Sequence, residues 1–253
     1  MLKELKIIYH QGSQYIRDLR HTEVPGIFKG KPVISSEAAD ETALVELCPT
    51  DAITSSPLCI DLGKCIFCGA CAFHSPHKIK FTKDYHLSVN SREALIIKAG
   101  EDKPLQVDNT KVRPEIISLF KGSFKLRQVS AGGDNSAELE LNASGNVQFD
   151  IGRLGFEFVA SPRHADALVI TGPITENMTE PLETCLRDAP APKAIILCGT
   201  DAISGGILAN SPALNRNFLE KHMVDLYIPG NPPHPLTFIN GLLSLLGRDR
   251  KKQ

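Results

Sequence analysis

Cysteine is concentrated in one short stretch of this chain, and that stretch constrains the fold more than any other feature. The 253-residue sequence contains seven cysteines, and five of them lie between Cys48 and Cys71. The N-terminal sequence has no long apolar stretch typical of a secretion signal, so we expect a protein of the reducing cytoplasm. Clustered thiols in that compartment indicate metal binding rather than disulfides.

The sequence around residues 65–76 is typical of proteins that bind iron–sulfur clusters. It reads CIFCGACAFHSP, in which Cys65, Cys68 and Cys71 follow the C-x2-C-x2-C spacing of bacterial ferredoxins. In that motif a fourth cysteine precedes the proline and binds the other cluster of a two-cluster fold. This chain has Ser75 at the fourth position.

A second copy of the motif ends at Cys48, which is followed by proline. Counting back by the motif's spacing, the three earlier positions hold no cysteine: they are Ala38, Glu41 and Leu44. Because each cluster takes three ligands from one motif and the fourth from the other, one cluster has lost its whole ligand set. The other keeps its whole set, namely Cys48, Cys65, Cys68 and Cys71. The sequence therefore predicts one [4Fe–4S] cluster on these four thiols.

A structural zinc site is the alternative interpretation, because four cysteines also bind zinc tetrahedrally. The close spacing of Cys65, Cys68 and Cys71 favours the cubane. Cys59 lies outside the motif. We interpret Cys185 and Cys198, in an expected helix and strand, as buried unreactive thiols.

The chain divides into two parts that differ in pattern. Residues 1–97 contain the cysteine motif and many turn-forming residues, and residues 98–115 form a polar segment interpreted as a linker. Residues 116–253 contain short apolar runs alternating with helical stretches, which predicts a parallel α/β sheet. The expected strands are residues 124–129, 165–170, 193–198 and 224–228.

In open parallel sheets, the loops after the strands gather at one edge, where ligands bind. The loops expected at that edge here are residues 132–136, 199–201 and 230–233.

Residues 27–97 resemble the two-cluster ferredoxin subunit of complex I and of membrane-bound group 4 [NiFe] hydrogenases. The matching segments are FKGKP, CPTDAI, IDLGKC with the cysteines that follow it, and FTKDYHL with Arg92-Glu93. This resemblance implies an α+β domain like that of a bacterial two-cluster ferredoxin, with one [4Fe–4S] cluster.

Residues 116–246 resemble the small hydrogenase subunit of the same complexes, which corresponds to the complex I 20 kDa subunit. The matching segments are SPRHAD, GTDAISGG and YIPGNPP. The resemblance implies an α/β parallel-sheet domain. The whole chain is similar to a fusion of two adjacent subunits of a formate hydrogenlyase-like or energy-converting hydrogenase-related complex.

The resembled small subunit carries a further [4Fe–4S] cluster on four cysteines, and the corresponding positions here hold no thiol. They are Asp134, Ala137, Asp201 and Asn231. The resemblance thus implies that two of three clusters are lost. Oxygen atoms of Asp134, Asp201 and Asn231 would suit Mg²⁺ or Ca²⁺. A helix N-terminus there would suit an anion, and a pocket filled with polar groups and water is the third possibility.

The resemblance implies an iron–sulfur electron-transfer subunit of a membrane-associated complex I-like or group 4 hydrogenase-like oxidoreductase complex, not a self-sufficient enzyme. The implied partners are a hydrogenase-like large subunit and, through it, membrane subunits at the cytoplasmic face of the membrane. The alternative is a non-redox structural adaptor in a hydrogenase-related complex, in which the cluster stabilises the fold.

Charge and hydropathy exclude other classes of partner. The net charge of −1 gives no indication of a nucleic-acid partner. The sequence contains no run of 18 or more apolar residues, so no direct membrane span is expected. Walker A and dinucleotide-binding motifs are also absent from the sequence.

Overall fold

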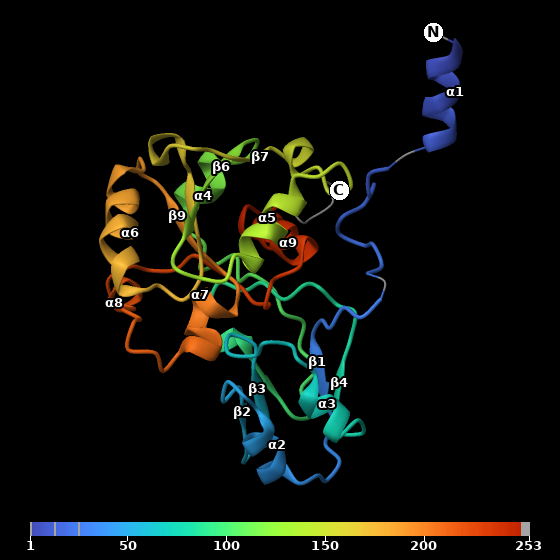
Figure 1. Ribbon diagram of the computed structural model, residues 1–253, viewed down its shortest axis with the longest axis vertical. Helices are drawn as coiled ribbons and strands as arrows, with labels where there is room; N and C mark the ends of the chain where they lie inside the picture. The colour runs from blue at the N-terminus through green and yellow to red at the C-terminus, as the bar shows by residue number, and fades with distance from the viewer. Residues whose placement is uncertain (1, 13, 25, 249–253) are drawn as a thin grey trace.

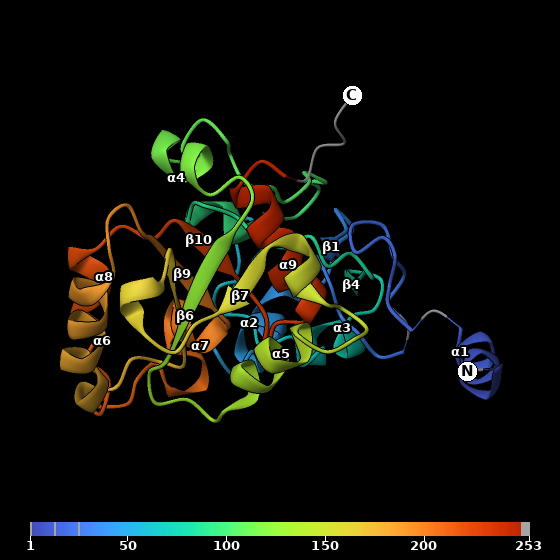
Figure 2. The same cartoon turned by 90° about the horizontal axis from the view of Figure 1, so that it is seen from above.

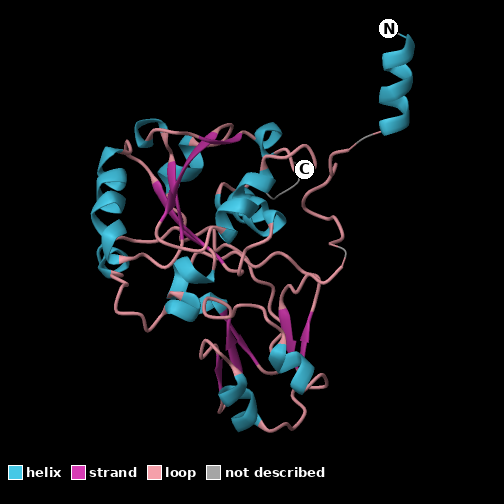
Figure 3. Cartoon of the chain, in the orientation of Figure 1, coloured by secondary structure: helices cyan, strands magenta, loops and turns pink. Residues whose placement is uncertain are grey.

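The computed structural model describes residues 2–12, 14–24 and 26–248. Figure 1 shows two packed lobes and a helix that projects away from them. The first lobe contains residues 26–98, and the α/β lobe contains residues 114–248. Most of the regular structure lies in the α/β lobe (Figure 3).

A five-stranded parallel sheet forms the centre of the α/β lobe, with the order β10-β9-β8-β6-β7. Its strands are β6 (Phe124–Ser130), β7 (Phe156–Phe158), β8 (Ala167–Thr171), β9 (Ala194–Cys198) and β10 (Leu226–Ile228). Every residue of β8 and β9 is buried, as expected of central strands covered on both faces. The predicted α/β sheet is therefore confirmed, and the three-residue strand β7 is an addition to it.

Helices cover both faces of this sheet (Figure 2). Helices α5 and α9 contribute to the core on one face, and α6 and α8 contribute to the core on the other. The helices of this lobe are α4 (Pro114–Leu119), α5 (Ser136–Ser144), α6 (Glu176–Asp188), α7 (Thr200–Ser204), α8 (Asn217–Lys221) and α9 (Pro235–Leu245). Its 3₁₀ turns are η2 (Ile151–Leu154), η3 (Pro162–His164) and η4 (Gly206–Leu208).

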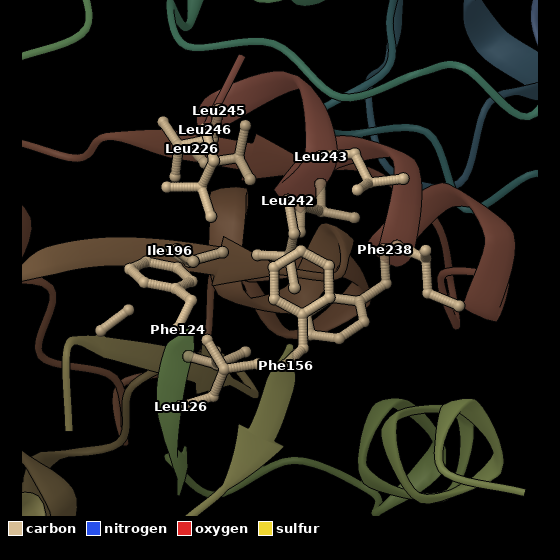
Figure 4. Packing of buried hydrophobic residues seen from close by; sticks show 14 of the residues in the cluster. Phe124, Leu126, Phe156, Ile196, Leu226, Phe238, Leu242, Leu243, Leu245 and Leu246 are labelled. Atoms are coloured by element: carbon tan, nitrogen blue, oxygen red, sulfur yellow. The ribbon is translucent and has the colours of Figure 1, made fainter. Parts of the chain in front are cut away.

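Helix α9 is almost wholly buried and anchors the lobe. Figure 4 shows its side chains Phe238, Leu242 and Leu243 packed against side chains of the sheet. Phe124 and Phe156, from the adjacent strands β6 and β7, are among the largest fully buried side chains. Because each such side chain removes a large apolar area from water, this face contributes much of the lobe's stability.

The first lobe consists of two small antiparallel sheets and two short helices. One sheet pairs β1 (Pro32–Ile34) with β4 (Ile79–Phe81), and the other has the order β2-β3-β5. Its remaining elements are β2 (Ile53–Thr54), β3 (Cys59–Asp61), β5 (Ile96–Lys98), α2 (Glu41–Leu47), α3 (Ala70–His74) and η1 (Glu93–Leu95).

The segment between β5 and α4 contains no regular element, but its apolar side chains are buried. Leu105 belongs to a core cluster that includes residues of both lobes. Val107 and Val112 belong to the core on the other face of the large sheet. The segment expected as a linker is thus packed against the rest of the chain.

Helix α1 (Leu2–Gln11) has no buried residue and projects away from both lobes (Figures 1 and 2). Its apolar side chains, including Leu2, Leu5 and Ile8, are exposed. Within the described residues, no helix has the length and apolar character needed to cross a membrane.

Candidate functional site

Four cysteines line one pocket in the first lobe, and we call it the thiol pocket. They are Cys48, Cys65, Cys68 and Cys71. Cys48 directly follows α2, and the other three lie in the loop after β3 and in the first turn of α3. Aliphatic side chains such as Ile53 and Ile60 complete the lining. The structure therefore brings together the four thiols that the motif spacing grouped.

The loop that carries three of these thiols has an unusual backbone. Phe67 and Gly69 both have positive φ angles, of 54° and 83°. A β-carbon on Gly69 would lie 2.6 Å from Cε of Lys29, so only glycine fits here without displacing that side chain. Before this loop, the carboxylate of Asp61 accepts a hydrogen bond from the Gly63 amide at 2.8 Å. These contacts fix the turn in which Cys65 lies.

Backbone amides donate to two of the sulfur atoms. The amide of Ala52 donates to Sγ of Cys48, and the amide of Phe67 donates to Sγ of Cys65, both at 3.3 Å. In addition, the Lys29 ammonium donates to the carbonyl oxygen of Cys68 at 3.0 Å. Hydrogen bonds to ligand sulfurs are among the features that set the reduction potential of an iron–sulfur cluster.

Burial keeps two of these thiols protonated in the absence of metal. Desolvation raises the pKa of Cys65 to about 12 and that of Cys71 to about 11. Cys65 also lies near the other three thiols, and each added negative charge would raise its pKa further. A metal centre replaces these protons, since a coordinating thiol is deprotonated outright. The donor set thus fits a metal centre of soft, thiolate-binding character.

Within the described residues, no three side chains of His, Cys, Asp or Glu are close enough to hold one metal ion. The four cysteines of the thiol pocket are among those residues. A mononuclear zinc site requires its four sulfurs to converge on a single point. A cubane instead would offer a separate iron to each thiolate.

A second pocket lies at the strand-end edge of the large sheet, and we call it the acidic pocket. Its lining includes Asp134, Ala137, Asp201 and Asn231, the four positions that the family resemblance grouped. They follow β6, β9 and β10, whose carboxyl ends meet at this edge. Glu138 also lines the pocket, although it was not among the site residues predicted from the sequence.

The carboxylates of the acidic pocket have contrasting environments. The Ser136 hydroxyl and amide donate to Asp134 at 2.6 and 2.9 Å, and these bonds lower the pKa of Asp134. Burial raises the pKa of Asp201, and the nearby charges of Asp134 and Glu138 raise it further. Glu138 is 6% exposed and accepts a hydrogen bond from the Thr171 hydroxyl at 2.6 Å.

The three remaining cysteines have separate environments. Cys59 is buried, and its thiol donates to the carbonyl oxygen of Pro57 at 3.2 Å. Cys198 is fully buried beside the acidic pocket, and burial raises its pKa. Cys185 is only half-buried, which differs from the buried position expected for it.

Comparison with known proteins identifies one family model and several relatives. The family model described as NADH ubiquinone oxidoreductase, 20 kDa subunit, matches residues 135–245. Formate hydrogenlyase subunit 7 of Escherichia coli is 35% identical over 150 residues, which are 58% of this chain and 59% of that protein. The probable membrane-bound hydrogenase subunit mbhJ of Pyrococcus furiosus is 33% identical over 118 residues, which are 47% of this chain and 71% of that protein.

This chain belongs to the NADH ubiquinone oxidoreductase 20 kDa subunit family. Another relative is one of the subunits of the NADH-quinone oxidoreductase of Clostridium beijerinckii. It is 41% identical over 108 residues, which are 42% of this chain and 64% of that protein. The matches thus span about three fifths to seven tenths of the length of these relatives.

Membership of the 20 kDa subunit family confirms the resemblance inferred for the second part of the chain. The family model begins at residue 135, so it includes the loops of the acidic pocket from that residue onward. The thiol pocket lies outside the matched residues.

Proposed function

We propose that this protein is an iron–sulfur electron-transfer subunit of a complex I-like or hydrogenase-like oxidoreductase complex associated with a membrane. The observation that carries the proposal is the thiol pocket, in which four cysteines from two distant segments meet around a largely apolar space. Membership of the 20 kDa subunit family supports the kind of complex.

One [4Fe–4S] cluster would be held by Cys48, Cys65, Cys68 and Cys71, and it would supply one-electron chemistry. The chain contributes the amides that donate to sulfur and the apolar wall that excludes water. Cys68 is exposed, so the pocket reaches the protein surface at this ligand. A partner's redox group could approach the cluster there.

The proposed organisation follows the sequence. Residues 1–97 form a ferredoxin-like domain with one cluster, residues 98–115 connect it, and residues 116–253 form a small-subunit-like α/β domain without its cluster. The cluster loss is supported by the acidic pocket, whose lining includes the four residues that the resemblance aligns with cluster cysteines, Asp134, Ala137, Asp201 and Asn231.

The partners are proposed from the relatives. Their names describe them as subunits of formate hydrogenlyase, of a probable membrane-bound hydrogenase and of NADH-quinone oxidoreductase. By analogy, this chain docks a hydrogenase-like large subunit and, through it, membrane subunits on the cytoplasmic face.

Anaerobic purification with iron and sulfide analysis tests the proposal. We expect about four irons and four sulfides per chain, and one EPR signal after dithionite reduction. Cys65→Ser is expected to lose the cluster, whereas Cys59→Ser, outside the thiol pocket, is expected to keep it. About eight irons would contradict the loss of ligands, and zinc without sulfide would contradict the cubane.

A structural adaptor is the second candidate function, and the acidic pocket favours it. With no thiol at the four positions that the resemblance gives, this lobe would offer electrons no second cluster to reach. The cluster would then act through its binding energy, which contributes to folding. Assembly and turnover of the parent complex with a Cys65→Ser subunit decide between the two roles. Turnover that persists without the cluster supports the adaptor, and assembly without turnover supports electron transfer.

A further inference from the structure

The loop that carries Cys65 is bonded to a helix 135 residues later in the sequence. The hydroxyl of Thr200, the first residue of α7, donates to the carbonyl oxygen of Cys65 at 2.8 Å. Thr200 is 0% exposed, so water does not compete for this bond. The bond joins the α/β lobe directly to one of the four thiol-bearing residues of the first lobe.

Helix α7 is itself held rigidly in place. The guanidinium of Arg216 donates to the carbonyl oxygens of Asp201, Ala202 and Ile203 at 3.3, 2.8 and 2.8 Å. The amide of Thr200 donates to the carbonyl oxygen of Gly230 at 2.8 Å. Since these bonds fix the backbone of α7, the hydroxyl of Thr200 is held in a fixed position.

The first lobe packs closely against helix α7. A β-carbon on Gly63, two residues before Cys65, would lie 2.8 Å from Cγ2 of Ile203. It would also lie 2.7 Å from Cζ of Arg92, whose guanidinium makes two hydrogen bonds with Asp61, at 2.7 and 2.6 Å. The loop leading to Cys65 is therefore enclosed between α7 and the Arg92–Asp61 pair, with no room for a larger residue at position 63.

We propose that Thr200 is a positioning residue for the cluster ligand Cys65, so that the α/β lobe completes the cluster site of the first lobe. The inference rests on the proposed cluster. The hydroxyl fixes the orientation of the Cys65 peptide, and with it the direction of the thiolate. The hydrogen bond also draws negative charge from the carbonyl oxygen of Cys65, and a less negative carbonyl beside the cluster favours the more negative, reduced state. Outer contacts of this kind typically change metal affinity 10- to 100-fold when removed.

Thr200→Val tests this role because valine keeps the shape of threonine and removes only the hydroxyl. We expect the cluster of this variant to be lost at least about tenfold faster to an iron chelator. Its midpoint potential, measured by EPR-monitored titration, should be more negative than that of the wild type. Thr200→Ser keeps the hydroxyl and should restore both properties.

Thr171→Val is the matched control, because Thr171 is another fully buried threonine of the α/β lobe. Its hydroxyl bonds to Glu138 and to the carbonyl oxygen of Val129, not to the cysteine loop. This variant should be less stable in thermal unfolding and yet keep the potential of the wild type. If Thr200→Val does not fold, Thr200→Ala removes the same hydroxyl without crowding the site and is judged by the same two measurements.

A Thr200→Val protein with unchanged chelator resistance and unchanged potential would overturn the proposal, as would an equal shift in Thr171→Val. Failure of the proposed cluster itself would look different. In that case the wild-type protein would contain no iron and sulfide, before any variant is compared.

Discussion

The pKa values of Asp134 and Asp201 shift in opposite directions, although both side chains line the acidic pocket. Asp134 receives hydrogen bonds that favour its charged form, whereas Asp201 is desolvated beside other carboxylates. At neutral pH the charge on Asp201 therefore opposes folding, and the charge on Asp134 supports it.

Asp201→Asn is expected to raise the melting temperature at pH 7. The native pKa of Asp201 lies above the ordinary 3.8, so the native state binds this proton more tightly than the unfolded state. Stability from this group is present at low pH and is lost as the pH rises through the native pKa. The gain in melting temperature from Asp201→Asn should therefore decrease toward pH 4. Thermal unfolding of both proteins at several pH values measures this change.

Asp134→Asn is the matched control and should act with the opposite sign. Because its native pKa is lowered, Asp134 contributes stability above pH 3.8 that the amide loses. Repeating both series with MgCl₂ and CaCl₂ tests the alternative of a cation site. A divalent stabilisation that disappears in Asp201→Asn would contradict the expected gain and favour a bound cation.

Lys29 is expected to influence the potential of the proposed cluster through its charge. Its ammonium donates to the carbonyl oxygen of Cys68, and its side chain covers Gly69. Lys29→Met should make the midpoint potential more negative, with a difference that decreases at high salt. Lys121→Met, at an exposed position of the α/β lobe, should leave the potential unchanged. Equal midpoint potentials in the wild type, Lys29→Met and Lys121→Met would contradict this expectation.

At the scale of elements, one ion pair ties α4 to the edge of the large sheet. Arg113, which precedes α4, donates to both carboxylate oxygens of Asp225 at 3.0 Å. Asp225 precedes β10, and its side chain is 6% exposed. The same carboxylate accepts from the amide of Ile195 in β9, and Arg113 also bonds to the carbonyl oxygen of Lys193. The pair thus joins three elements.

Arg113→Met should lower the free energy of unfolding by about 3 kcal/mol, because it leaves the charge of Asp225 buried without its partner. Urea denaturation of the variant measures this loss. Arg187→Met removes an exposed pair with Asp188 and should cost less than about 1 kcal/mol. Similar costs for the two variants would show that the Arg113 pair is effectively solvated.

The sequence predicted the elements of the α/β lobe because their apolar runs are strong and regular. Residues 165–170 and 193–198 contain the runs that become β8 and β9. It did not predict β7, since three residues after a glycine give no periodic pattern. Cysteine spacing grouped the four thiols of the thiol pocket, and the family resemblance grouped the four positions of the acidic pocket.

Contacts between distant segments could not be predicted from the sequence. The bond from Thr200 to Cys65 joins residues 135 apart, and no spacing rule applies at that distance. Glu138 was missed as part of the acidic pocket for a related reason. A charged side chain in a helix is usually exposed, and only the packing of α5 shows that this one is buried.

At the scale of the whole molecule, the two lobes share their apolar cores. One cluster of buried residues includes Leu44 and Ile60 of the first lobe together with Leu168 and Leu197 of the large sheet. A backbone bridge between Val89 and Tyr227 adds to the contact. Separation of the lobes would therefore expose apolar surface on both sides.

We expect the lobes to unfold in one cooperative transition. Hydrogen exchange followed by mass spectrometry at increasing urea should show amides of both lobes losing protection together. Peptides from helix α1, which has no buried residue, should exchange readily under all conditions. Loss of protection in the first lobe at a lower urea concentration would contradict a shared core.

Because the two lobes share a core, the first lobe cannot pack fully until the α/β lobe has been synthesised. A ribosome releases Cys48 to Cys71 first, while Leu168, Leu197 and Thr200 are still to be synthesised. At about 5–20 residues per second, the 135 residues that separate Cys65 from Thr200 take on the order of ten seconds. During that interval the pocket lining has been made, but Cys65 lacks its bond to Thr200 and the first lobe lacks the packing of Leu168 and Leu197. For the proposed cluster, we therefore expect stable insertion of iron and sulfide only after Thr200 has been synthesised.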